Sequence, residues 1–172
     1  MQNNESIIDK LDKIKSMPCL FKTTNKEGED INFNLRLTKE DYRLLYIDCL
    51  SDKNEEMGSI EFYIKENKTF LYFLVTQPNF QNKGVASALL ETMEYISCLE
   101  GVKHIEGKYR PMNEFALPFY KKHGYYVPNE IKDWSVYDET WTMSKELDYN
   151  TIIQKGEATI TFGNNEEKEI EM

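Results

Sequence analysis

A polar loop between an apolar run and an amphipathic stretch is the part of this chain best suited to chemistry. The apolar run ends at Val75, and apolar positions at helical spacing begin at Val85. The first backbone N–H groups of a helix have no intrahelical acceptor, and the helix dipole adds partial positive charge, so such a junction binds anions. Gly84 lets a ligand approach the backbone, Lys83 adds a cation, and Ala86 keeps the first turn narrow. The sequence therefore predicts a phosphate site in this loop.

Other kinds of chemistry are disfavoured by composition and spacing. The loop contains neither G-x-G-x-x-G nor G-x-x-x-x-G-K-[ST], which argues against a dinucleotide-binding fold and a P-loop ATPase. The chain has 2 histidines, and its 3 cysteines are widely spaced, so we expect no metal site and no disulfide framework. A net charge of −9 disfavours nucleic acid as a partner, because binding to phosphates needs clustered lysine and arginine.

The residues before the loop predict antiparallel strands. Short polar turns separate β-rich runs, which implies hairpins over residues 31–37, 42–50, 58–64 and 69–76. Residues 38–41 could instead cap a helix over residues 42–50, although the Tyr, Leu, Ile and Cys content favours a strand.

The residues after the loop alternate between helix and strand. An apolar stripe of Val85, Leu89, Met93, Ile96 and Leu99 predicts a helix over residues 85–100 that stops at Gly101. It is followed by a strand at 102–109, a helix at 113–123 and a strand at 141–147. The whole is an α/β fold with a mixed sheet, an antiparallel meander followed by β-α-β-α-β, with its parallel step between residues 69–76 and 102–109.

The two ends of the chain and its overall composition add further expectations. The spacing predicts a helix over residues 6–15, while residues 148–172 contain a β-like patch at 158–162 and an acidic tail. The 172 residues suit one domain, and the apolar runs fall far short of the roughly 20 residues that span a membrane. No secretory signal is visible, so the expected location is the cytoplasm.

Two segments together resemble the GNAT N-acetyltransferase superfamily. Residues 81–86 match the pattern Q/R-x-x-G-x-G/A, which in that superfamily forms the acyl-CoA pyrophosphate loop. Residues 113–125 match its second cofactor segment, N-x-x-A-x-P-F-Y-x-K-x-G-Y. The resemblance implies an acetyltransferase domain over residues 31–147, flanked by an N-terminal helix and strand extension (1–30) and a C-terminal extension (148–172).

The resemblance also implies how acetyl-CoA would bind. In the family, the strand before the loop splays from its parallel neighbour, and its backbone pairs with the pantetheine arm, which here falls on Leu74, Val75 and Thr76. Asn113 would meet the pantetheine or a bound water. The pyrophosphate would lie on the backbone of Gln81, Asn82, Lys83, Gly84, Val85 and Ala86.

The implied reaction is direct transfer of an acetyl group from acetyl-CoA to a primary amine, without a metal or a covalent enzyme intermediate. By resemblance, Tyr120 would be the general acid toward the CoA sulfur. Glu61 is the first candidate for the base, with Glu106 and Glu114 as alternatives. The oxyanion would be met by backbone N–H groups near Val75.

The acceptor is the open question, because most relatives carry two helices between their first strands and this chain has no room for them. The acceptor wall must then come from the N-terminal helix, the C-terminal residues or a second subunit in a homodimer. Net charge favours a small cationic amine. Alternatives are a protein or peptide amine and a non-catalytic acyl-CoA-binding regulatory module.

Overall fold

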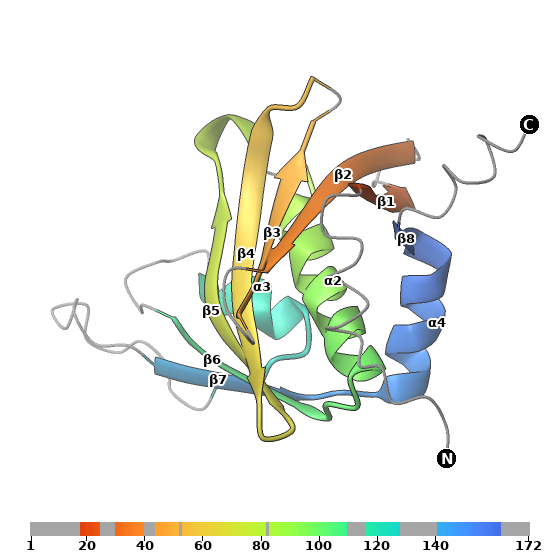
Figure 1. The fold of residues 1–172 in the computed structure, drawn as a ribbon. Coiled ribbons are helices and arrows are strands. Elements are labelled where there is room, and N and C mark those ends of the chain that lie inside the picture. The colour runs from red at the N-terminus through yellow and green to blue at the C-terminus, as the bar shows by residue number, and fades with distance from the viewer. Residues whose placement is uncertain are drawn as a thin grey trace, which may run out of the picture.

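Among the described residues, the strands form one eight-stranded sheet (Figure 1). The computed structural model describes residues 18–24, 30–39, 44–51, 53–81, 83–109, 116–127 and 141–162. The strand order is β7-β6-β5-β4-β3-β2-β1-β8. The strands are β1 (Pro18–Thr24), β2 (Asp30–Lys39), β3 (Leu44–Leu50), β4 (Glu56–Lys65), β5 (Lys68–Thr76), β6 (His104–Tyr109), β7 (Trp141–Glu146) and β8 (Ile160–Phe162). The helical elements are the 3-10 turn η1 (Pro78–Phe80), α2 (Val85–Leu99), α3 (Ala116–Lys122) and α4 (Tyr149–Thr159).

The predicted mixed α/β fold is confirmed. Strands β2 to β5 form the antiparallel meander, and β5 and β6 make the parallel step. Residues 44–50 are a strand, so the alternative of a helix over residues 42–50 is wrong. The helix predicted over residues 6–15 and the acidic tail lie outside the described residues.

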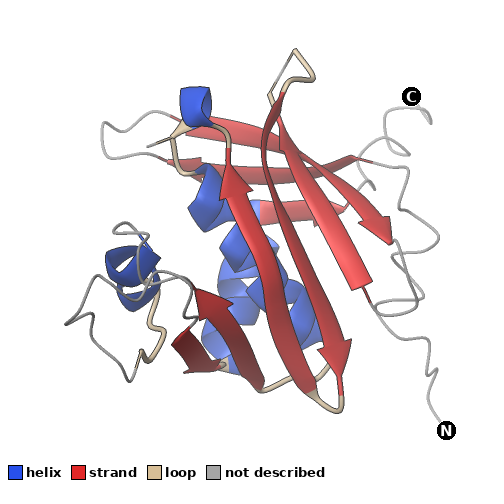
Figure 2. Ribbon diagram, turned by 90° about the vertical axis from the view of Figure 1, so that its left-hand side faces the viewer, coloured by secondary structure: helices blue, strands red, loops and turns tan. Residues whose placement is uncertain are grey.

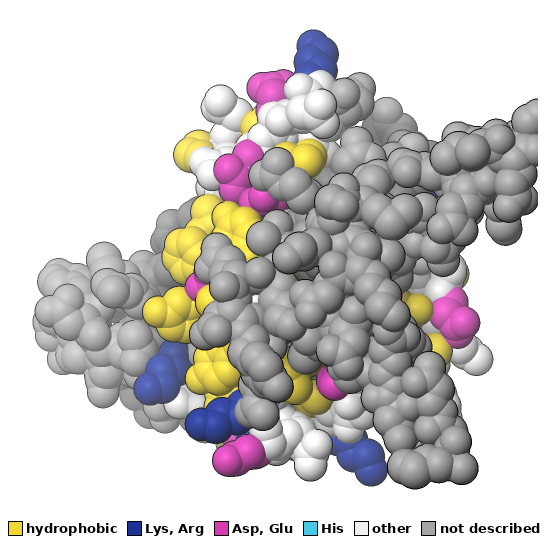
Figure 3. All heavy atoms as spheres, in the orientation of Figure 1, with side chains coloured by type: hydrophobic (Ala, Val, Ile, Leu, Met, Phe, Trp, Pro, Cys, Tyr) yellow, Lys and Arg dark blue, Asp and Glu magenta, His cyan; other side chains and the backbone are white. Residues whose placement is uncertain are grey.

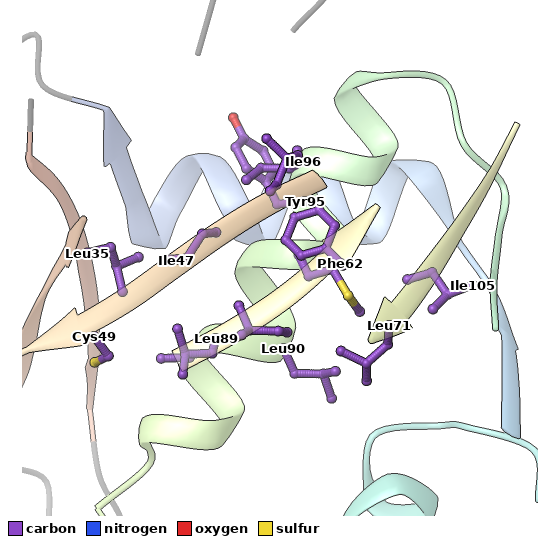
Figure 4. Close-up of a cluster of buried hydrophobic side chains, with 14 of the residues drawn as sticks. Leu35, Ile47, Cys49, Phe62, Leu71, Leu89, Leu90, Tyr95, Ile96 and Ile105 are labelled. Carbon is purple, nitrogen blue, oxygen red and sulfur yellow. The ribbon is translucent and has the colours of Figure 1, made fainter. Parts of the chain in front are cut away.

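Helix α2 supplies the centre of the hydrophobic core. Its predicted stripe is buried from Val85 to Ile96, whereas Leu99 is 36% exposed at the last turn. Beneath it lie side chains of the central strands, including Phe62 and Leu71 (Figure 4). Each such side chain contributes about 1.5–3 kcal/mol when fully buried. The helix stops at Gly101, which adopts a φ of 84° and donates its N–H to the Cys98 carbonyl.

The C-terminal residues contain a helix that the sequence analysis did not predict. Asp148 caps α4 by accepting a hydrogen bond from the Thr151 N–H at 3.3 Å. The helix packs along α2, and Gly156 lies against the Tyr95 ring so closely that a Cβ would sit 2.0 Å from it. Within the predicted β-like patch, only Ile160–Phe162 form a strand, which pairs antiparallel with β1.

The helices of the described chain lie on one face of the sheet (Figure 2). Along β4 the side chains of Ile60, Phe62 and Ile64 are buried beneath α2. Because side chains alternate along a strand, Glu61 and Tyr63 lie on the opposite face, where both are half-buried. The sheet therefore has one face for the core and another that no described helix covers.

Candidate active site

Strands β5 and β6 pair over only part of their length, and this opens the site. Residues 68–71 of β5 pair with residues 104–107 of β6. Beyond Leu71, residues 73–76 pair with β4, and no described strand pairs with the other edge of residues 72–76. The two strands diverge from this point (Figure 2). An extended ligand could therefore hydrogen-bond to the free edge of β5 as an added strand would.

A β-bulge marks the place where the strands part. Glu61 pairs with Phe73 and Phe62 pairs with Leu71, so Tyr72 is the extra residue on β5. Bulges bend a strand and re-aim its side chains. Tyr72 is 69% exposed and Phe73 is 53% exposed. Hydrophobic side chains accordingly gather over β5 on the left of the molecule (Figure 3).

The end of β5 and the start of α2 meet at Gly58. A Cβ at Gly58 would lie 2.6 Å from the Val75 carbonyl oxygen and 2.8 Å from Val85 Cγ1. Only glycine allows strand and helix to approach β4 this closely. The loop between them is also fixed by the Gln77 N–H, which donates to the Met57 carbonyl at 2.9 Å.

The loop from Gln81 to the first turn of α2 presents its backbone to solvent. Gly84 caps the helix with a φ of 84° and no side-chain hydrogen bond. Gln81, Lys83 and Gly84 are exposed, while Val85 is 1% exposed and anchors the first turn in the core. Exposed backbone at the start of a helix is suited to binding an anion, and the phosphate site itself stays a prediction. Asn82 lies outside the described residues.

Tyr120 lies on α3, on the same face of the sheet as α2. It is 8% exposed, and burial raises its pKa to about 12. A phenol with this pKa keeps its proton at neutral pH, so it can donate to a thiolate. Its ring meets the edge of the Tyr125 ring at a centroid distance of 5.6 Å. Asn113, predicted to meet the pantetheine or a bound water, is outside the described residues.

Glu61 lies on the opposite face, where it is flanked by aromatic residues. In the strand register it is paired with Tyr46 on β3 and with Phe73 on β5. The structure therefore does not place Glu61 beside Tyr120. Glu61 pairs with Phe73 on the edge of β5 that faces β4, so the width of β5 separates Glu61 from the unpaired edge. A donor bound at the unpaired edge and an acceptor on the face that carries Glu61 would meet across this strand.

The two alternative candidates for the general base are Glu106 and Glu114. Glu106 accepts a hydrogen bond from Lys68 at 3.2 Å and one from His104 at 3.0 Å, in the part of β6 that is paired with β5. The hydrogen bond from Lys68, with that from His104, lowers the Glu106 pKa and makes it a weaker base. Glu114 lies outside the described residues.

Covalent and metal chemistry find little support among the described side chains. Burial raises the pKa of Cys49 to about 12 and that of Cys98 to about 11, so neither forms a thiolate near neutral pH. No group of three or more histidine, cysteine, aspartate or glutamate side chains in the described ranges could hold a metal ion. None of the described helices is long and apolar enough to cross a membrane.

Sequence reasoning missed a buried polar cluster behind the site. Glu94, in the middle of α2, is 5% exposed and accepts hydrogen bonds from Tyr125 and Lys145. A cavity of about 390 Å³ lies beside it, between α2, the end of α3 and α4. A signal was present, because Glu94 falls four residues after Leu90 and three before Ser97 on the buried side of the helix.

Comparison with known proteins gives the family and the fold of the chain. The family described as "Acetyltransferase (GNAT) domain" matches residues 41–127, just over half of the chain. The PaiA N-acetyltransferase of Thermoplasma acidophilum, solved in complex with coenzyme A, is 24% identical, with a TM-score of 0.54 over 61% of this chain and 62% of its own. The chain thus matches less than two thirds of that relative's length.

Two further solved structures share the fold. The ribosomal-protein-S18-alanine N-acetyltransferase of Escherichia coli is 16% identical, with a TM-score of 0.55 over 63% of this chain and 72% of its own. Nourseothricin acetyltransferase is 14% identical, with a TM-score of 0.55 over 80% of this chain and 92% of its own. No curated protein matches the sequence.

Proposed function

The chain belongs to the GNAT acetyltransferases, a family of acyl-CoA-dependent N-acyltransferases, and from that premise we propose that it transfers an acetyl group from acetyl-CoA directly to the primary amine of a small cationic molecule. The observation that carries the proposal is the unpaired edge of β5 over residues 72–76, next to the exposed start of α2. This combination offers a strand edge to a pantetheine arm and backbone N–H groups to a pyrophosphate.

In this proposal the backbone binds acetyl-CoA at two places, the unpaired edge of β5 and the start of α2. The pantetheine amides pair with Leu74, Val75 and Thr76, and the pyrophosphate lies on residues 81–86. Asn113 would meet the pantetheine or a bound water, as the family resemblance implies. Because these contacts use the main chain, they depend on the positions of β5 and α2 more than on particular side chains.

The acetyl transfer needs one base and one acid. Glu61 takes a proton from the acceptor ammonium, and the neutral amine attacks the thioester carbonyl to form the C–N bond. Backbone N–H groups near Val75 stabilise the oxyanion. The C–S bond then breaks, and Tyr120 donates its proton to the leaving thiolate, while the amide nitrogen loses its second proton to solvent.

The cationic acceptor is supported by the face of the sheet that carries Glu61. Tyr46 and Phe73 flank the Glu61 carboxylate in the strand register, and Asp48 lies two residues from Tyr46 on the same strand. A carboxylate among aromatic rings suits an organic cation, because ring faces attract positive charge. The net charge of −9 adds a general attraction.

The proposal is tested by two measurements on one sample. Calorimetric titration with acetyl-CoA reports donor binding, and release of free thiol against polyamines, aminoglycosides, amino acids and basic peptides reports transfer. We expect binding, with turnover on the small cationic amines. Turnover on basic peptides alone would indicate a protein or peptide acceptor, binding without turnover would indicate a regulatory module, and failure to bind would refute the proposal.

Substitutions separate the two catalytic roles from donor binding. Tyr120→Phe should lower kcat roughly a hundredfold with little change in acetyl-CoA affinity, as expected for loss of a general acid. Tyr126→Phe is the matched control, because Tyr126 is 67% exposed and should leave kcat unchanged. Glu61→Gln should lower kcat less at high pH, where the acceptor amine is already neutral.

A further inference from the structure

The buried cluster around Glu94 joins three elements. The Tyr125 hydroxyl donates to Glu94 Oε2 at 2.8 Å, and Lys145 Nζ donates to both carboxylate oxygens at 3.1 Å. Lys145 also donates to the His123 carbonyl at 2.8 Å and lies 5.4 Å from the centroid of the Tyr125 ring. The cluster therefore ties the middle of α2 to β7 and to the turn that follows α3.

Stability alone is a poor explanation for this cluster. Removing two charges from water costs much of what their attraction returns, so well-packed apolar side chains often stabilise a fold as well as a buried ion pair does. Burial raises the pKa of Glu94, although Lys145 and Tyr125 oppose the effect. What the cluster provides beyond stability is geometry, since each hydrogen bond fixes a direction and a distance.

That geometry extends to Tyr120. The Tyr125 N–H donates to the Tyr120 carbonyl at 2.9 Å, and the two rings meet edge to face. Helix α3 is only 7 residues long, which is too short to hold its own position without tertiary contacts. The turn at residues 123–125 directly follows α3. Lys145 donates to the His123 carbonyl in this turn, and the Tyr125 hydroxyl donates to Glu94, so these hydrogen bonds hold the end of the helix.

We propose that Glu94, through Tyr125 and Lys145, is a positioning residue that fixes the end of α3 and with it the Tyr120 side chain. The inference rests on the proposed function, in which Tyr120 is the general acid. A small error in placing a catalytic group can cost up to about a hundredfold in rate. Loosening this cluster should therefore reduce kcat while leaving the donor contacts on β5 and α2 intact.

The primary test is Tyr125→Phe, which removes the hydroxyl that donates to Glu94 but keeps the ring against Tyr120. With acetyl-CoA and the fastest amine of the panel above, we expect kcat to fall about tenfold and the acetyl-CoA Kd to stay within twofold. Glu94→Gln, which keeps the shape of the side chain, should behave in the same way. Tyr95→Phe is the control, because it also removes the hydroxyl of a buried tyrosine. Tyr95 lies on α2, directly after Glu94 in the sequence, and is about as buried as Tyr125.

A double-substitution cycle distinguishes positioning from a merely structural role. If Tyr125 acts through Tyr120, then Tyr125→Phe should have no further effect on kcat in a Tyr120→Phe background. An undiminished effect in that background, or a wild-type kcat for Tyr125→Phe alone, would overturn the inference and leave the proposed function standing. A wild-type kcat for Tyr120→Phe would instead overturn the acid assignment, and the positioning role with it.

Discussion

The two ends of strand β5 differ in their strand pairing and in their exposure to solvent. Its closed end, residues 68–71, is paired on both sides, and Thr69 and Leu71 there are 0% and 7% exposed. Its open end, residues 72–76, begins with the exposed bulge residue Tyr72 and the exposed Phe73, and from Phe73 onward it is paired on one side only. Under the proposed function, the paired half contributes stability and the unpaired half binds the donor, so the two roles are separated along one strand.

Glycines of two matched kinds allow this comparison to be tested. Gly58 and Gly107 permit close packing at the open and closed ends of β5, respectively. Gly84 and Gly101 adopt the same φ of 84° at the two ends of α2, with no atom within 4 Å of an added Cβ. The first pair tests packing, and the second pair tests backbone conformation.

The largest effect is expected for Gly58→Ala, which should damage both stability and donor binding. The new Cβ would meet the Val75 carbonyl oxygen at 2.6 Å, so the open end of β5 must move. We expect the free energy of unfolding to fall by about 1–3 kcal/mol in urea titration. The acetyl-CoA affinity should fall at least tenfold by calorimetry, and an unchanged affinity would show that this strand end does not contact the donor.

Gly107→Ala should damage stability alone. Its Cβ would lie 3.2 Å from Leu71 Cβ and 2.8 Å from Met143 Cε, which is the movable end of a flexible side chain. We expect a loss of about 1–2 kcal/mol in the same urea titration. The acetyl-CoA affinity of the folded protein should stay within twofold of wild type, and a tenfold loss would remove the distinction between the two ends.

The contrast between α2 and α4 shows what the sequence could predict about the fold. Helix α2 was predictable because its apolar stripe repeats at helical spacing and a glycine ends it. Helix α4 carries Gly156 in its interior and few apolar residues, chiefly Ile152 and Ile153. Its helical state depends on packing against Tyr95, a contact between residues far apart in the sequence.

Some features of the candidate site could likewise be predicted from the sequence, and others could not. The exposed loop at the start of α2 was predictable because Gly84 and the apolar stripe that begins at Val85 are local features. The bulge at Tyr72 was not, since it depends on how β4 and β5 pair. Nor could spacing place Glu61 and Tyr120 on opposite faces of the sheet, because that assignment follows from where α2 and α3 pack.

Gly84→Ala tests the loop beside the open end of β5, because it places a side chain at a backbone conformation that favours glycine. An L-residue held at a φ of 84° costs about 1–2 kcal/mol, and the same cost applies to Gly101→Ala at the other end of α2. Both variants should therefore lose similar stability in thermal unfolding. Only Gly84→Ala should bind acetyl-CoA more weakly, by several-fold in calorimetry, and equal affinity in the two variants would argue against a pyrophosphate site at this loop.

The smallest effect is expected for His123→Gln, which tests how the open end responds to pH. His123 Nε2 is 2.9 Å from the Ser87 hydroxyl on the first turn of α2, and burial lowers the pKa of the imidazole. Since the unfolded chain takes up this proton more readily, the stabilising contribution is present above about pH 6.5 and is lost as the pH falls. The wild type should therefore lose more stability than His123→Gln between pH 7 and pH 5, by about 1 kcal/mol or less.

Calorimetric titration with acetyl-CoA at pH 7 and pH 5 tests whether the effect of His123 is confined to the open end of β5. Because Ser87 belongs to the turn on which we propose that the pyrophosphate lies, the wild-type affinity for acetyl-CoA should also weaken on acidification more than that of His123→Gln. His104 supplies the control, since it lies on β6 beside Glu106 and Glu146 at the closed end. If His104→Gln changed the pH dependence of acetyl-CoA affinity as much as His123→Gln, the two ends of β5 would not be independent, because a change at the paired half would have reached the half that binds the donor.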